Sequence, residues 1–147
     1  MASKIWGFTL TLLVLCFVIK AQQALDIPDV VKKQVKKMHA RCMSTTGLSE
    51  ELMNEAHKGK LPSDQTFKCF LHCMFDMFGL VDHNNDMHLD SLLEVLPPEI
   101  HPNIKKLADA CDMKKGADGC DTVYQAVLCY LETDGAFIAD AMNDLLG

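Results

Sequence analysis

The chain has 147 residues, 49% of them apolar, with seven cysteines and a net charge of −6 at pH 7. This length is typical of one domain, and the acidic balance excludes nucleic acid as an expected partner, because phosphate binding requires a basic surface. Beyond the amino-terminal segment, no apolar run approaches the roughly 20 residues of a membrane-spanning helix, so stable membrane insertion is not expected.

Residues 1–24 have the pattern of a secretory signal peptide. A lysine precedes the apolar run 5–19, and small residues follow at Ala21 and Ala24. We therefore expect cleavage after Ala21 or after Ala24, and a secreted, extracellular domain over residues 25–147. The alternative, an uncleaved membrane anchor, is disfavoured because the apolar run is short for a bilayer.

Cleavage would remove two lysines and no acid, which changes the net charge from −6 to −8, and would leave six cysteines. An even number of cysteines in a small exported chain predicts disulfides. Cys120 and Cys129 lie about 180° apart on one predicted helix and cannot bond to each other. Cys69 and Cys73 share a helix face, where a mutual bridge would be strained. Each pair must therefore bond to other elements, and spacing alone leaves several pairings open.

Helix signals divide the first half of the mature chain into three helices. Residues 26–29 combine acids with a proline, which suits a helix start, and Gly47 is expected to end this helix. A second, short helix is predicted over residues 49–57. The central helix is predicted over Ser63–Gly79, with Ser63 as its N-cap and Gly79 in the left-handed conformation at its end.

The central helix has a cysteine face and an opposite apolar face. The apolar face consists of Phe67, Leu71, Met74, Phe75 and Phe78. From the residues alone, ordinary core is the favoured interpretation of this face, and the wall of a ligand cavity is the alternative.

The second half of the mature chain begins with the polar loop 82–86. Short helices are predicted over Leu89–Leu96, Pro102–Met113 and Gly119–Thr133, the last with Asp118 as N-cap and Asp121 completing a box-like cap. The tail, residues 136–147, repeats apolar residues at helical spacing. Since no stretch alternates like a strand, the predicted fold class is all-α, with six short helices.

Neither catalysis nor metal binding is predicted. No nucleophile–base pair or phosphate-binding glycine loop is recognisable, so the chain is not expected to be an enzyme. Asp82, Asn84 and Asp86 have the spacing of a calcium loop, but Met87 and Leu93 replace its essential glycine and glutamate. We therefore expect no metal and no cofactor.

The cysteine spacing resembles that of the insect odorant-binding and pheromone-binding proteins. Cys-x3-Cys from Cys69 is followed by Cys-x8-Cys from Cys111 and Cys120, and the similarity extends over the mature chain. Further matching segments are Leu96-Pro97-Pro98-Glu99, Val123-Tyr124 and Asp134-Gly135-x-Phe137. The resemblance implies the disulfides Cys42–Cys73, Cys69–Cys120 and Cys111–Cys129.

The resemblance also implies an apolar cavity inside the six helices. The function it implies is a secreted carrier of small hydrophobic odorants or pheromones, which delivers them to membrane chemoreceptors from an extracellular fluid such as sensillum lymph. The residues expected to line the cavity are Leu71, Phe75, Leu92, Leu96, Leu107, Val127, Tyr130 and Phe137. Tyr124 and Tyr130 could offer a hydroxyl to an alcohol, aldehyde or ester.

Two surface features allow more than one interpretation. The tail is expected to act as a lid through Phe137 rather than to remain free, and protonation of Asp140 and Asp144 would ease its burial. The first helix carries a basic stripe, which is favoured as a solvated face over a contact with a receptor or an anionic membrane. Its members are Lys32, Lys33, Lys36, Lys37 and Arg41.

The functional alternative to a carrier is a saposin-like lipid-binding or membrane-active protein, which also combines six cysteines with amphipathic helices. A carrier is expected to act as a monomer or weak homodimer and to bind its ligand stoichiometrically. Six histidines add a possible response to acid, because imidazole titrates near pH 6.5.

Overall fold

The structure is a computed structural model that describes residues 27–111 and 115–146. Within these ranges the secondary structure is helical apart from one isolated bridge between Val81 and Met87, which confirms the all-α class. The elements are α2 (Asp29–Thr46), α3 (Glu50–His57), α4 (Gln65–Met77), the 3-10 helices η1 (Leu89–Glu94) and η2 (Pro98–Ile100), α5 (His101–Ala110) and α6 (Gly119–Leu146). The predicted signal peptide lies outside the described residues.

Local capping accounts for most helix ends in the first half. Gly47 ends α2 in the left-handed conformation at φ 70°, and the Ser49 hydroxyl accepts a hydrogen bond from the Leu52 amide at the start of α3. The predicted Ser63 cap of α4 is wrong. Asp64 is the N-cap, and its carboxylate accepts hydrogen bonds from the amides of Thr66 and Phe67. Both residues are good caps, so sequence preference alone does not choose between neighbours.

The helix predicted over Leu89–Leu96 is a 3-10 helix, η1, that ends at Glu94. Its few residues and the following proline pair leave little room for i→i−4 hydrogen bonds, and short 3-10 turns serve where an α-helix cannot extend. The next helix, α5, starts directly after η2 at His101 and ends at Ala110. The predicted end at Met113 lies outside the described residues.

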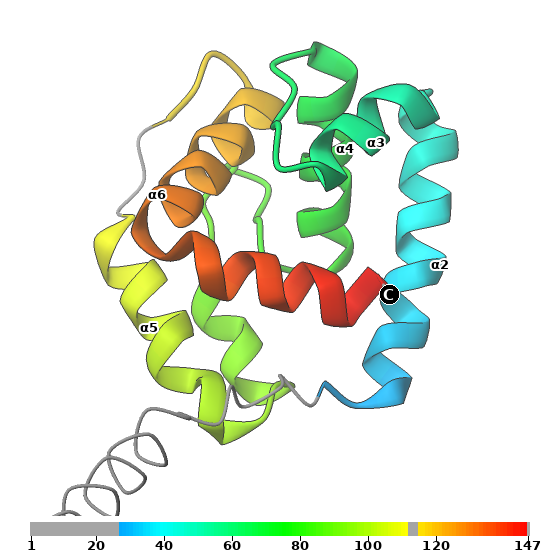
Figure 1. Cartoon of the computed structure of the whole chain (residues 1–147). Helices are drawn as coiled ribbons and strands as arrows, with labels where there is room; N and C mark the ends of the chain where they lie inside the picture. Colours follow the sequence, from blue (N-terminus) through cyan, green and yellow to red (C-terminus); the bar gives the residue numbers. More distant parts are fainter. Residues whose placement is uncertain (1–26, 112–114, 147) are drawn as a thin grey trace, which may run out of the picture.

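The final helix is longer than predicted, because α6 continues through the tail to Leu146 with a kink at Asp134 (φ −156°, ψ 63°). The Asp134 carboxylate accepts a hydrogen bond from the Phe137 amide at 3.3 Å, which caps the helix a second time after the kink. Its other oxygen lies 2.9 Å from Lys106 Nζ on α5. In Figure 1 the half of α6 after the kink crosses to α2.

Most of the buried apolar side chains in the described residues form two clusters. The first cluster joins α2, α3 and α4 to Tyr124 of α6, and its buried members are Cys42, Leu48, Met53, Phe67, Phe70 and Tyr124. The second cluster lies among η1, α5 and α6, and its buried members are Leu89, Ile104, Leu107, Cys111, Ala126 and Tyr130. Phe70, which was not assigned to the apolar face of α4, is only 5% exposed. It is buried because α4 packs against both α2 and α6 rather than along one face.

Three disulfides connect these elements. Cys42–Cys73 joins α2 to α4, Cys69–Cys120 joins α4 to α6, and Cys111–Cys129 joins the end of α5 to α6. These are the pairs that the family resemblance implies. Each helix that carries two cysteines bonds to two different partners, so the covalent links run through both clusters.

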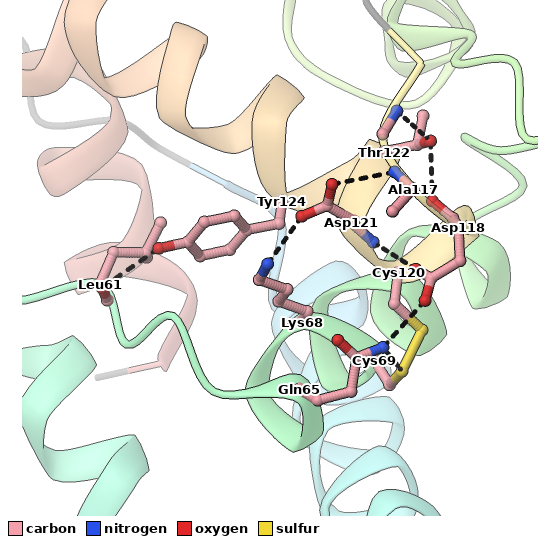
Figure 2. A network of polar contacts seen from close by, with 11 residues as sticks. Leu61, Gln65, Lys68, Cys69, Ala117, Asp118, Cys120, Asp121, Thr122 and Tyr124 are labelled. Atoms are coloured by element: carbon pink, nitrogen blue, oxygen red, sulfur yellow. Dashed lines mark hydrogen bonds and ion pairs between the residues drawn. A yellow bond between two sulfur atoms is a disulfide. The ribbon is translucent and has the colours of Figure 1, made fainter.

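A polar network reinforces the Cys69–Cys120 bridge (Figure 2). Lys68 Nζ lies 2.7 Å from Asp121 Oδ1 and 4.9 Å from the ring centroid of Tyr124. The hydrogen bond from Lys68 lowers the pKa of Asp121, and the same contact raises the pKa of Lys68. The Asp118 carboxylate accepts from the Asp121 amide, as the predicted cap requires. The network fixes the start of α6 against the start of α4.

Candidate ligand-binding site

Six of the eight side chains predicted to contact ligand gather in the second cluster. They are Phe75, Leu92, Leu96, Leu107, Tyr130 and Phe137. Leu71 instead packs on the first cluster. Val127 is half-buried and belongs to neither cluster. The fold thus brings together residues from α4, η1, α5 and both halves of α6, although they are widely spaced in the sequence.

Next to this cluster lies a partly open cleft of about 310 Å³, which we call the Tyr130 cleft. Its lining residues are Met87, Leu89, Asp90, Ala108, Asp109, Cys111 and Tyr130. Its volume is at the lower end of the range for small-molecule sites. Five of these residues belong to the second cluster, and the two aspartates are exposed.

Tyr130 is the buried polar group of this region. Its side chain is only 5% exposed, and burial raises the pKa of its phenol to about 12. In the part of the chain that the structure describes, its hydroxyl has no hydrogen-bond partner. Tyr124 differs in this respect, because its hydroxyl donates to the Leu61 carbonyl at 3.4 Å.

The tail is held against the amino-terminal end of α2. Asp144 Oδ1 lies 2.7 Å from Lys32 Nζ, and Asp144 Oδ2 accepts a hydrogen bond from the Ile27 amide at 3.2 Å. Lys32 therefore differs from the other members of the basic stripe, which are exposed. Together with Lys106–Asp134 at the kink, this contact fixes both ends of the tail helix. The tail lies across the fold as a strap (Figure 1).

Acid is expected to weaken the contact between Asp144 and Lys32, whereas the sequence suggested that protonation would ease burial of the tail. The hydrogen bond from Lys32 lowers the pKa of Asp144 below its usual value. A carboxylate whose pKa is lower in the folded than in the unfolded state stabilises the contact at neutral pH. This stabilisation is lost only when the pH falls below about 4. Protonation of Asp144 therefore weakens the strap instead of easing its burial. Asp140 is exposed.

The loop after α4 is held by its own side chains. The Asp82 carboxylate accepts hydrogen bonds from the amides of Asn84 and Asp86, which together with His88 lower its pKa to about 2. Lys115 Nζ lies 2.5 Å from Asp86 Oδ1. Among the described residues, no three His, Cys, Asp or Glu side chains are grouped so that they could hold a metal ion. Asp82 Oδ1 instead accepts the hydrogen bonds from the amides of Asn84 and Asp86 that hold this loop.

His39 on α2 is the histidine with a perturbed environment. Its ring meets Phe70 edge-on at 5.2 Å between centroids, and its buried Nε2 has no partner within the described residues. Burial is the main reason that the pKa of His39 lies below its usual value, and His57 lowers it further. A protonated ring at this place would bury an unpaired N–H beside an aromatic side chain.

We expect His39 to make the folded state less stable in mild acid. Its pKa is lower when folded than when unfolded, so the unfolded chain binds more protons and stability is lost as the pH falls below about 6.5. Urea unfolding at about pH 7.5 and about pH 5 measures this loss, which should shrink in His39→Leu. Asp82 and Asp144 titrate below this window. An undiminished loss in the variant would assign the effect to other histidines.

Sequence reasoning missed the contacts that hold the strap and part of the cleft. Lys106–Asp134 and Lys32–Asp144 join residues far apart in the chain, and no local pattern pairs them. Met87 was considered only as a departure from the calcium-loop pattern, yet it lines the cleft. The helical spacing of apolar residues around Leu89, Ala108 and Cys111 is the signal that could have found this part of the lining.

The described helices do not include one with both the length and the apolar character needed to cross a membrane. The PBP/GOBP family matches residues 25–133. The chain is 46% identical to general odorant-binding protein 69a of Drosophila melanogaster over the full length of both.

Solved structures of odorant-binding proteins have the same fold. A medfly odorant-binding protein has a TM-score of 0.71 and 40% identity, with 78% of this chain and 98% of that chain covered. Odorant Binding Protein 7 from Anopheles gambiae, solved in complex with an azo compound, has a TM-score of 0.72 and 31% identity over 82% of this chain and 98% of that chain. These similarities show that the chain belongs to the PBP/GOBP family of odorant-binding proteins, which are small-ligand carriers and not enzymes.

Proposed function

We propose that this carrier holds a small hydrophobic ligand in the interior bordered by the second cluster. The observation that supports this most directly is the gathering of apolar side chains from four elements beside the Tyr130 cleft. Phe75, Leu92 and Phe137 are only half-buried although they belong to the cluster, so they retain surface that a ligand could cover. Covering apolar surface contributes about 25 cal/mol per Å² before the costs of association.

The carrier is proposed to act outside the cell and to deliver its ligand to membrane chemoreceptors. A signal peptide over residues 1–24, cleaved after Ala21 or Ala24, would export it to an extracellular fluid such as sensillum lymph. Three disulfides support this location, because an oxidising compartment preserves them. The mature domain is proposed to work as a monomer or weak homodimer.

Displacement of a fluorescent apolar probe tests the proposed function. The mature protein should bind N-phenyl-naphthylamine in a one-to-one complex, and small volatile compounds should displace it. Leakage of dye-loaded anionic liposomes, measured with the same preparation, separates the carrier from a saposin-like protein. Liposome disruption without stoichiometric probe binding would refute the carrier and favour the membrane-active alternative.

The strap is proposed to act as a lid over the ligand, with Phe137 as its contact residue. Phe137 and Ile138 pack on the second cluster directly after the kink. Truncation after Gly135 should therefore speed ligand release about tenfold, which corresponds to roughly 1.4 kcal/mol of lost contact. Stopped-flow dilution of the probe complex measures the release rate.

Met142→Ala is the matched control for this prediction, because Met142 lies on the same strap but is 46% exposed. Its release rate should equal that of the unchanged protein, whereas Phe137→Ala should reproduce most of the effect of truncation. Equal release rates from the truncated and complete chains would contradict the lid.

A further inference from the structure

We propose that the Tyr130 cleft selects uncharged ligands that carry one carbonyl oxygen on an apolar body, and that it discriminates against carboxylates. The inference rests on the proposed carrier function and adds to it a ligand class. Three features of the cleft carry it: the hydroxyl of a buried tyrosine that has no partner among the described residues, an apolar side that can hold a hydrocarbon chain, and acidic groups at its exposed part.

The hydroxyl of Tyr130 supplies the hydrogen-bond donor. The side chain is 95% buried by its 5% exposure, lines the cleft, and has no partner for its hydroxyl within the described residues. Among the described residues His39 Nε2 is the fully buried polar side-chain atom without a partner, so the Tyr130 hydroxyl is reached from the cleft and is not sealed in the core. A ligand oxygen that accepts its hydrogen gains the net contribution of one hydrogen bond. The pKa of about 12 keeps the phenol protonated and able to donate at neutral pH.

The apolar side of the cleft comes from three consecutive parts of the chain. Met87 and Leu89 precede and begin η1, Ala108 lies on α5, and Cys111 follows α5. The disulfide from Cys111 to Cys129 fixes this end of α5 against α6, one residue before Tyr130. The Tyr130 hydroxyl and the apolar surface are therefore held in a fixed position relative to each other, which suits a hydrocarbon ligand that carries one polar atom.

The charges of the cleft oppose an anionic ligand. Asp90 and Asp109 are its charged lining residues, both are exposed, and no basic side chain is among the described lining residues. A carboxylate bound beside Tyr130 would lie near two like charges and would lose its own hydration. A ketone, aldehyde or ester avoids both costs and keeps the acceptor oxygen.

The test uses three probe competitors of equal chain length: 2-nonanone, nonane and nonanoate. Each competitor is titrated against the complex of N-phenyl-naphthylamine with the full mature protein at neutral pH and low salt, and displacement of the probe gives its affinity. We expect the ketone to bind more tightly than the alkane and the carboxylate. Tyr130→Phe should weaken ketone binding about fivefold, since a net hydrogen bond contributes roughly 1 kcal/mol, and should leave nonane unchanged.

Tyr124→Phe is the matched control, because the Tyr124 hydroxyl already donates to Leu61 and lies in the first cluster. It should leave the ratio of ketone to alkane affinity unchanged. The double variant Asp90→Asn, Asp109→Asn should raise nonanoate affinity without altering that ratio. A general loss of folding would lower the affinity for both ligands equally, so it would leave the ratio of the two affinities unchanged.

The outcomes separate this inference from the proposed function. Equal affinities for the three competitors, a tighter carboxylate, or an unchanged ratio in Tyr130→Phe would overturn the ligand class while the carrier function stands. Failure of the unchanged protein to bind the probe or any competitor would refute the carrier function itself, and the ligand class with it.

Discussion

Replacement of Cys69 and Cys120 by alanine is expected to lower the free energy of unfolding by about 4 kcal/mol. The bridge closes a loop with a sequence separation of 51 residues, the longest of the three, so its removal releases the most chain entropy in the unfolded state. This loss is a large fraction of the free energy of unfolding of small domains, which is usually about 5–15 kcal/mol. Urea unfolding followed by circular dichroism measures it.

The matched control is the alanine pair at Cys111 and Cys129, whose separation is 18 residues. Its expected loss is about 3 kcal/mol on the same entropy scale. Peptide mass mapping should first show that the two remaining bridges are intact in each variant. A greater loss from the shorter loop would contradict the entropic explanation and indicate that contacts around the bridge determine its contribution.

Phe67→Ala is expected to cost about 3–5 kcal/mol of stability, as truncations of large buried aromatic side chains do. Phe67 is 2% exposed in the first cluster, where it contributes to the packing of α4. The cavity left behind is expected to remain unfilled, because Phe70 beside it is itself held against His39. Thermal or urea unfolding of the purified variant gives the value.

The same variant tests whether the two clusters have different tasks. At a temperature where Phe67→Ala is still folded, its affinity for the apolar probe should match that of the unchanged protein. Phe137→Ala in the second cluster should show the reverse, with a smaller loss of stability and faster probe release, because its side chain is half-buried. Equal effects of both variants on stability and on release would contradict a division of the interior.

Much of the secondary structure could be predicted from the sequence because its causes are local. Gly47 and Ser49 mark helix ends through their own conformation and side chain, and Asp118 begins α6 in the same way. The all-α class follows from helical periodicity over each segment. Where local preferences were nearly equal, as for Ser63 and Asp64, the prediction was wrong.

The site depended on contacts between distant segments, which periodicity does not encode. Leu71 and Phe75 lie one turn apart on one predicted face, yet packing assigns them to different clusters. The two tyrosines are chemically identical in the sequence. Only the fold gives Tyr124 a carbonyl partner and leaves Tyr130 without a hydrogen-bond partner among the described residues.

The sequence by itself determined the all-α class, most of the helix starts and, through its cysteine spacing, the family of this protein. The tertiary structure alone decided that Asp144 meets Lys32, that Asp134 both kinks α6 and contacts α5, and which apolar side chains border the cleft. The physical reason is range. Capping and periodicity act within a few residues, whereas ion pairs and burial depend on how whole helices pack against one another.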